Sequence, residues 1–313
     1  MTTAIPYASR PEWTDLSPVS VSEGPAPFAP ILFSDEYKDA IGYFLACVAA
    51  NERSERVMAL TAHLIDLNPA LYDVWRHRQL TLIELRSDLR VELRFVSDLI
   101  LDSPKNYQLW QHREFIVERL NDGTDELKFV DTIFESDPKN YHAWYYRQWV
   151  VIRFSLWDTE LDLTDKLIVQ DVRNNSAWTY RYFLLFGSSK DVPGRDIDVD
   201  MPMELDYVMS AIRRAPSNES PWVYLRGILR HTKTAAPEAV MAFCGGLVAG
   251  QCMSAHLYTF LADEYESVGQ LELARGCMEH LSAVVDKTRT KYWQFRLHQI
   301  AGKPDTAAKK STD

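Results

Sequence analysis

The sequence predicts an all-α fold: a right-handed superhelix or crescent of αα-hairpin repeats with a period of about 34 residues, preceded by an extended, proline-rich arm. Three observations predict it. Tryptophan recurs at nearly constant spacing with arginine three residues later, a Glu-Leu pair recurs at a fixed distance before it, and prolines crowd the amino terminus. The 313 residues are 46% hydrophobic and 25% charged, a globular composition that excludes disordered, collagen-like and disulfide-scaffold classes.

The first expected element is the arm, residues 1–33. Six of the fifteen prolines lie within its first thirty residues, which excludes a helix there. The arm also carries Tyr7, Trp13 and Phe28, so we expect part of it to lie on a surface of the protein. At the other end, residues 301–313 offer nothing to pack, and we expect a disordered tail.

We interpret residues 34–300 as a single helical-repeat domain. Four of its tryptophans, Trp75, Trp110, Trp144 and Trp178, are 35, 34 and 34 residues apart, and each is followed by arginine at the third position. A fifth tryptophan keeps the pattern with its basic residue, Arg226, one position late, and Trp293 with Arg296 resembles a worn sixth copy. The structural repeat positions are Trp75, Arg78, Trp110, Arg113, Trp144, Arg147, Trp178, Arg181 and Trp222.

Each repeat contains two helices. The Glu-Leu pairs at 92–93, 126–127, 160–161 and 204–205 place leucine 17 residues before a tryptophan, and apolar residues often follow that leucine at helical spacing. A Pro-x-Asn turn often precedes the tryptophan segment, as expected for a helix start. We expect an inserted loop at 187–194 and degenerate helices over 235–286 that close the array.

Residues that are identical in every repeat are expected to be structural. The tryptophans are expected to wedge between helices with a partner for each indole N–H, and the arginines to reach a carboxylate or a helix-end carbonyl of a neighbouring unit. Variable residues are more informative about function. The turns Lys105–Gln108 and Lys139–His142 lead into helix amino termini, which favour anions. These turns form either an electropositive strip or ordinary solvated turns. The spacing of the residues along the sequence is consistent with both interpretations.

Several function classes are disfavoured. The net charge of −10 makes general nucleic-acid binding a poor prediction, and no segment reaches about 18 uninterrupted apolar residues, so we expect no membrane span. Four scattered cysteines without a leader segment favour a reducing, cytoplasmic compartment. Phosphate-loop, nucleophile-elbow and zinc-ligand motifs are missing from the sequence, so we expect no metal site in this chain.

Three segments, 104–113, 138–147 and 171–178, closely resemble the repeats of protein prenyltransferase α subunits, specifically the one shared by farnesyltransferase and geranylgeranyltransferase type I. The resemblance extends from about residue 10 to 300 and includes 12–19 and 51–56. It implies a heterodimer in which this chain wraps a β subunit that binds Zn²⁺. That enzyme transfers a farnesyl or geranylgeranyl group from its diphosphate to the cysteine of carboxy-terminal CaaX proteins, such as small GTPases.

The resemblance also implies residue roles. Lys105 would approach the isoprenoid diphosphate and assist catalysis, Tyr141 would hydrogen-bond the diphosphate, and His142 would lie beside it. Gln108 would bind the carboxylate of the peptide substrate, with Tyr72 and Tyr107 along the same edge. The β subunit would set the isoprenoid and any need for Mg²⁺, which is possible for the farnesyltransferase form.

Two alternatives stay open at this point. One is a non-catalytic helical-repeat adaptor, and the other is the α subunit of geranylgeranyltransferase type II, which usually has added domains that this sequence lacks. The variable residues favour the catalytic subunit, because an adaptor needs only the structural tryptophans and arginines.

Overall fold

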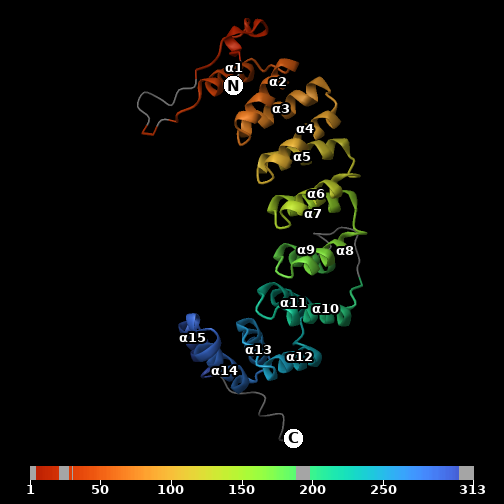
Figure 1. The fold of residues 1–313 in the computed structure, drawn as a ribbon, viewed down its shortest axis with the longest axis vertical. Helices are drawn as coiled ribbons and strands as arrows, with labels where there is room; N and C mark the ends of the chain where they lie inside the picture. Colours follow the sequence, from red (N-terminus) through yellow and green to blue (C-terminus); the bar gives the residue numbers. More distant parts are fainter. Residues whose placement is uncertain (1–4, 21–27, 30, 188–197, 303–313) are drawn as a thin grey trace. The chain divides into compact units, whose positions relative to one another are not determined.

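The computed structural model describes residues 5–20, 28–29, 31–187 and 198–302. It contains two compact units, residues 1–154 and 155–313. Figure 1 labels the helices of both units in chain order. The described ranges contain α-helices and short 3₁₀ and π segments without a β-strand, so the all-α prediction is confirmed. The single domain expected over 34–300 stays a prediction. Most of the expected loop at 187–194 and of the tail at 301–313 lies outside the described residues.

The helices follow one another in antiparallel pairs along most of each unit. The first unit contains 3₁₀ turns η1 (Tyr7–Ser9) and η2 (Pro11–Trp13), then α1 (Asp35–Ala49), α2 (Glu55–Leu67), α3 (Tyr72–Leu85), α4 (Leu89–Asp102), α5 (Tyr107–Leu120), α6 (Glu126–Ser136) and α7 (Tyr141–Phe154). The second contains α8 (Glu160–Gln170), α9 (Asn175–Phe186), α10 (Met201–Arg214), α11 (Glu219–Thr232), α12 (Glu238–Ala249), α13 (Ala255–Ser267), α14 (Leu271–His280), the π turn η3 (Leu281–Val285), η4 (Lys287–Arg289) and α15 (Thr290–Ile300).

The pair α4–α5 illustrates how the sequence forms one repeat. Val96 and Ile100 lie on one face of α4 and are fully buried, as their helical spacing predicts. Helix α5 begins after Asn106, whose side-chain oxygen accepts a hydrogen bond from the backbone N–H of Gln108 at 2.9 Å. That N-cap satisfies a donor that the helix itself cannot pair. The Pro-x-Asn turn therefore starts a helix because its asparagine side chain caps the first turn.

Each repeat tryptophan is fixed to its own turn. The indole Nε1 of Trp110 donates to the carbonyl oxygen of Pro104, six residues earlier, at 2.8 Å. The same bond joins Trp75 to Pro69, Trp144 to Pro138, Trp178 to Val172 and Trp222 to Pro216, at 2.8 to 2.9 Å. All five rings are buried, so the buried indole N–H has the partner that its burial demands.

The same turn carbonyl also binds the next repeat. The Asn140 side-chain amide donates to the carbonyl oxygen of Pro104 at 3.1 Å, while its own oxygen caps α7 through the N–H of Ala143. In the second unit, the Asn218 amide donates to Val172 at 2.8 Å in the same way. One asparagine therefore starts a helix and fixes the distance to the preceding turn.

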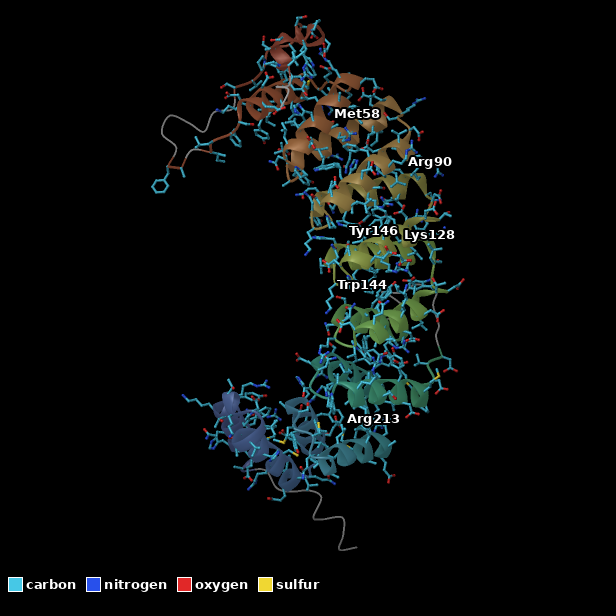
Figure 2. All side chains as sticks on the ribbon, in the orientation of Figure 1. Met58, Arg90, Lys128, Trp144, Tyr146 and Arg213 are labelled. Carbon is cyan, nitrogen blue, oxygen red and sulfur yellow. The ribbon has the colours of Figure 1, made fainter. Side chains whose placement is uncertain are left out.

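Buried carboxylates connect three helices at a time. Glu126 on α6 receives two hydrogen bonds from the Arg113 guanidinium of α5, at 2.7 and 3.0 Å, and one from the Tyr146 hydroxyl of α7 at 2.6 Å. Figure 2 labels Tyr146, and Arg113 and Glu126 are each about 3% exposed as side chains. The same bridge joins Arg78, Glu92 and His112, and also Arg181, Glu204 and Tyr224.

These bridges give most repeat arginines the carboxylate partner expected from the sequence. Arg78 also donates to the Met58 carbonyl at 2.8 Å, so it reaches both kinds of partner that we expected. Arg147 lies 2.8 Å from the Asp131 carboxylate. The glutamates of the recurring Glu-Leu pairs, which in the sequence indicated only the repeat period, supply the bridging carboxylates.

A repeat copy that the sequence analysis did not identify lies at Tyr258, between the copies at Trp222 and Trp293. Ser254 stands where the earlier repeats have asparagine, and its hydroxyl donates to the Pro216 carbonyl at 2.6 Å. Helix α13 follows, with Tyr258 at the tryptophan position. The Trp293 indole instead donates to the Asp286 carboxylate at 2.9 Å. This copy is difficult to recognise from the sequence, because serine replaces the repeat asparagine and tyrosine replaces the repeat tryptophan.

The first half of the arm is anchored and not extended throughout. Its two 3₁₀ turns bury Tyr7 and Trp13, and the Tyr7 hydroxyl lies 2.8 Å from Nδ1 of His63. Arg56 pairs with the Asp15 carboxylate at 2.7 Å and stacks over the Trp13 ring. The prolines exclude an α-helix but permit these short turns.

A buried bridge predicts a large loss of stability on mutation. Glu126→Ala leaves the Arg113 guanidinium buried without its carboxylate, which costs about 3–5 kcal/mol of unfolding free energy. Urea unfolding followed by circular dichroism measures it. Asp125→Ala on the same turn is the control, because its pair with Lys128 is exposed and is worth about 0–1 kcal/mol. Equal losses in both variants would contradict the assignment.

The Glu92 bridge predicts an acid-dependent loss of stability. Burial alone would raise the pKa of Glu92, but hydrogen bonds from His112 and Arg78 outweigh it and lower the pKa to about 2, from an ordinary 4.5. Because the folded-state pKa is below the unfolded one, this contribution is complete above about pH 4.5 and is lost as the pH falls towards 2. The stability gap between wild type and Glu92→Gln should therefore shrink between pH 5 and 3 in urea titrations. A constant gap would refute this.

Candidate functional site

The candidate site residues lie at the amino termini of three consecutive second helices in the first unit. Tyr72, Tyr107 and Tyr141 are the first residues of α3, α5 and α7, and all three are at least half exposed. Their common position follows from the repeat, since each stands three residues before a tryptophan. The fold therefore presents one tyrosine per repeat at equivalent places.

Lys105 lies in the turn before α5 with its side chain 78% exposed. Its Nζ is 3.4 Å from the Asp137 carboxylate in the turn before α7. An ion pair as exposed as this is worth about 0–1 kcal/mol, so a bound anion can displace Asp137 at little cost. The pair also reduces the positive charge of the strip that the two turns were expected to form.

Residues two positions before the tryptophans reach back to the preceding turn. The Gln108 side-chain amide donates to the carbonyl oxygen of Ala70 at 3.3 Å. One repeat later, His142 is hydrogen-bonded to the backbone of Lys105. Burial lowers the pKa of His142, and that hydrogen bond opposes the shift. Burial therefore disfavours the charged form of His142, whose ring lies beside the turn that carries Lys105.

A pocket of 250 Å³ lies between α5 and α7. It brings together three of the sequence-predicted residues, Tyr107, Tyr141 and His142, and the Tyr107 and His142 rings are 6.1 Å apart. Tyr72, Lys105 and Gln108 do not line it. The remaining lining residues are Trp110, Gln111, Glu114, Tyr145 and Tyr146.

The sequence analysis missed Glu114 and Tyr145 as pocket residues. The charge of Glu114, followed by burial, raises the pKa of the Tyr145 hydroxyl, and burial together with the charge of Glu118 raises the pKa of Glu114. A signal was present in the sequence. Positions 107, 110, 111 and 114 have the spacing of one helix face, and all four line the pocket.

Within the described part of the chain, no group of three or more His, Cys, Asp or Glu side chains is arranged to hold a metal ion. The helices that the structure describes also include none with the length and apolar character needed to cross a bilayer. The polar groups that the structure places around the candidate site are the Lys105 ammonium, the tyrosine hydroxyls, the His142 ring and the Gln108 amide.

Comparison with known proteins identifies relatives along nearly the whole chain. The family model "Protein prenyltransferase alpha subunit repeat" matches residues 89–120, 124–154, 157–187 and 202–232, which correspond to the pairs α4–α5 to α10–α11. The tomato (Solanum lycopersicum) protein farnesyltransferase/geranylgeranyltransferase type-1 subunit alpha is 37% identical over 95% of this chain and 92% of its own length. The Dictyostelium discoideum subunit of the same name is 33% identical over 95% of each chain.

A solved structure agrees with these sequence relatives. A chain of Candida albicans protein geranylgeranyltransferase-I complexed with GGPP matches with a TM-score of 0.84 and 30% identity, over 93% of this chain and 99% of that one. The helix pair α2–α3, which contains Trp75, is not among the segments that the family model matches, although it makes the same indole-to-carbonyl bond.

Proposed function

The chain belongs to the protein prenyltransferase α-subunit family, and we propose that it is the α subunit shared by farnesyltransferase and geranylgeranyltransferase type I. With a β subunit it transfers a farnesyl or geranylgeranyl group from the diphosphate to the cysteine thiol of CaaX proteins. The observation that carries the proposal is the placement of Lys105, Tyr107, Gln108, Tyr141 and His142 on two adjacent helix starts, in a chain related to this subunit over 95% of its length.

The proposed reaction gives each residue a physical task. The bond between the isoprenoid C1 and the diphosphate oxygen breaks while the cysteine sulfur bonds to C1, so negative charge accumulates on the departing diphosphate. The Lys105 ammonium leaves Asp137 and stabilises that charge, and the Tyr141 hydroxyl donates a hydrogen bond to it. His142 orders the Lys105 turn, and its place beside Tyr141 suits the same diphosphate.

The partner and cofactors belong to the proposal as well. A β subunit holds Zn²⁺, which would keep the substrate cysteine as a thiolate. That subunit sets the isoprenoid length and whether Mg²⁺ is needed. Gln108 binds the carboxylate of the peptide substrate through its amide, with Tyr72 and Tyr107 along the same edge. We place this activity in the cytoplasm, on substrates such as small GTPases.

The decisive experiment is co-purification followed by assay. The tagged chain is isolated from its native cells, and the complex is tested for transfer of both isoprenoids to a CaaX peptide, with and without a zinc chelator. An equimolar partner with zinc-dependent transfer supports the proposal. A monomer without partner or transfer supports the adaptor function instead.

Lys105→Ala is expected to lower turnover by a factor on the order of 10², because it removes charge stabilisation from the departing diphosphate. Peptide KM and assembly should change little. Steady-state kinetics of the purified heterodimer measures this. Lys128→Ala is a matched control, since Lys128 is 83% exposed and also lies 3.4 Å from a carboxylate. Unchanged turnover in Lys105→Ala would remove this lysine from the mechanism.

Gln108→Ala is expected to raise the peptide KM about tenfold with little change in kcat, because the variant loses one hydrogen bond to the charged carboxylate of the peptide. A peptide with an amidated carboxyl terminus is the control. The wild type should prefer the free acid, and the variant should discriminate less between the two peptides. If both enzymes discriminate equally, Gln108 does not bind the carboxylate.

A further inference from the structure

A partly buried carboxylate without a partner lines the pocket between α5 and α7. Glu114 projects from α5 beside Tyr107, Tyr141 and Tyr145. Among the residues that the structure describes, none makes a hydrogen bond or ion pair with it, and the only charge found to act on it is that of Glu118, which is also negative. A carboxylate held in this way destabilises the isolated chain unless a cation reaches it.

The repeat itself does not require this acid. Glu114 stands four residues after Trp110, and the other repeats have Gln79, Gln148, Tyr182 and Arg226 at that position. Two of these four residues are the uncharged amide of the same size. An acid that only one of the five tryptophan repeats carries at this position, and that has no hydrogen-bond or ion-pair partner among the described residues, is better explained by a ligand outside the chain.

The surroundings of Glu114 suit a cation. The aromatic rings of Trp110, Tyr107, Tyr141 and Tyr145 line the same 250 Å³ pocket, and ring faces attract ammonium and guanidinium groups. Burial lowers the pKa of His142 and so disfavours a positive charge on its ring. An acid within an aromatic lining is complementary to a lysine or arginine side chain.

The proposed substrates do not supply that cation where it is needed. The isoprenoid diphosphate and the peptide carboxylate are both anions, and Tyr141 is proposed to bind the first of them. An unpaired Glu114 in the same pocket would repel the diphosphate, so a positive charge must neutralise it before substrate binds. The β subunit is the component that is present before either substrate.

We propose that the pocket between α5 and α7 receives a lysine or arginine side chain of the β subunit when the heterodimer assembles, with Glu114 as its counter-ion. This inference rests on the proposed function. The pair neutralises Glu114, leaves the tyrosine hydroxyls available to substrate, and couples assembly of the two subunits to completion of the diphosphate site.

The test uses the heterodimer with the full chain and its β subunit. Glu114→Gln introduces the residue that two neighbouring repeats carry, and Glu118→Gln one turn away on α5 is the matched control. We expect Glu114→Gln to increase the dissociation rate of the heterodimer on the order of tenfold to a hundredfold, because truncating one partner of a desolvated charge pair acts mainly on dissociation. Glu118→Gln should leave that rate unchanged. Subunit exchange with fluorescently labelled chains measures both.

A second measurement excludes a purely structural role. Because burial opposes the charge of Glu114, Glu114→Gln should leave the urea midpoint of the unpartnered full chain unchanged or raise it. A lower midpoint would mean that Glu114 stabilises the fold and would overturn the inference. Wild-type dissociation rates in Glu114→Gln would also overturn it, and a raised KM for peptide or isoprenoid diphosphate with wild-type dissociation would assign the pocket to a substrate.

Failure of the inference is distinguishable from failure of the proposed function. If the wild-type chain forms no complex with a β subunit, the proposed function fails. When the wild type assembles and transfers the isoprenoid, but Glu114→Gln assembles equally well, only the inference fails.

Discussion

The bridge between a repeat arginine, a buried glutamate and a tyrosine or histidine determines the rest of this fold. A buried charge is tolerated only when its hydrogen bonds are complete. Glu126 meets that condition only if α5, α6 and α7 all stand at the correct separation and rotation. Apolar burial drives the helices together, but it is non-directional and is compatible with many positions of one helix along another. A bidentate hydrogen bond between arginine and a carboxylate is compatible with very few of these positions.

The turn carbonyls extend this constraint to the functional residues. Pro104 accepts hydrogen bonds from Trp110 in its own repeat and from Asn140 in the next. Lys105 directly follows Pro104, so its backbone is fixed on both sides while its side chain remains exposed. The repeated residues thereby hold the backbone of the turn, so lysine at 105 can stand where the preceding repeat has Ala70 without a change in the repeat framework.

The α5–α7 pocket shows how one repeat acquires a function of its own. Its lining residues Trp110 and Tyr146 also belong to the hydrogen-bond network of the repeats, while Glu114 and His142 occupy positions at which the repeats differ. Glu114, among the tyrosines of the pocket, disfavours binding of an anion, whereas Lys105 in the turn before α5 favours it. Under the proposed function, the balance between them depends on which charges a partner subunit brings to the pocket.

The sequence by itself determined the features that depend on local hydrogen bonds: the period, the paired helices, the asparagine caps, and the family resemblance centred on Lys105 and Tyr107. These bonds span two to six residues, so they appear in the sequence as fixed spacings. Tertiary structure decided which glutamate each arginine meets, because Arg113 and Glu126 are 13 residues apart whereas Arg181 and Glu204 are 23 apart across an insertion. It also decided that Tyr258 marks a further repeat copy and that Glu114 faces a pocket. Both depend on packing between helices, and sequence spacing within one helix does not encode that packing.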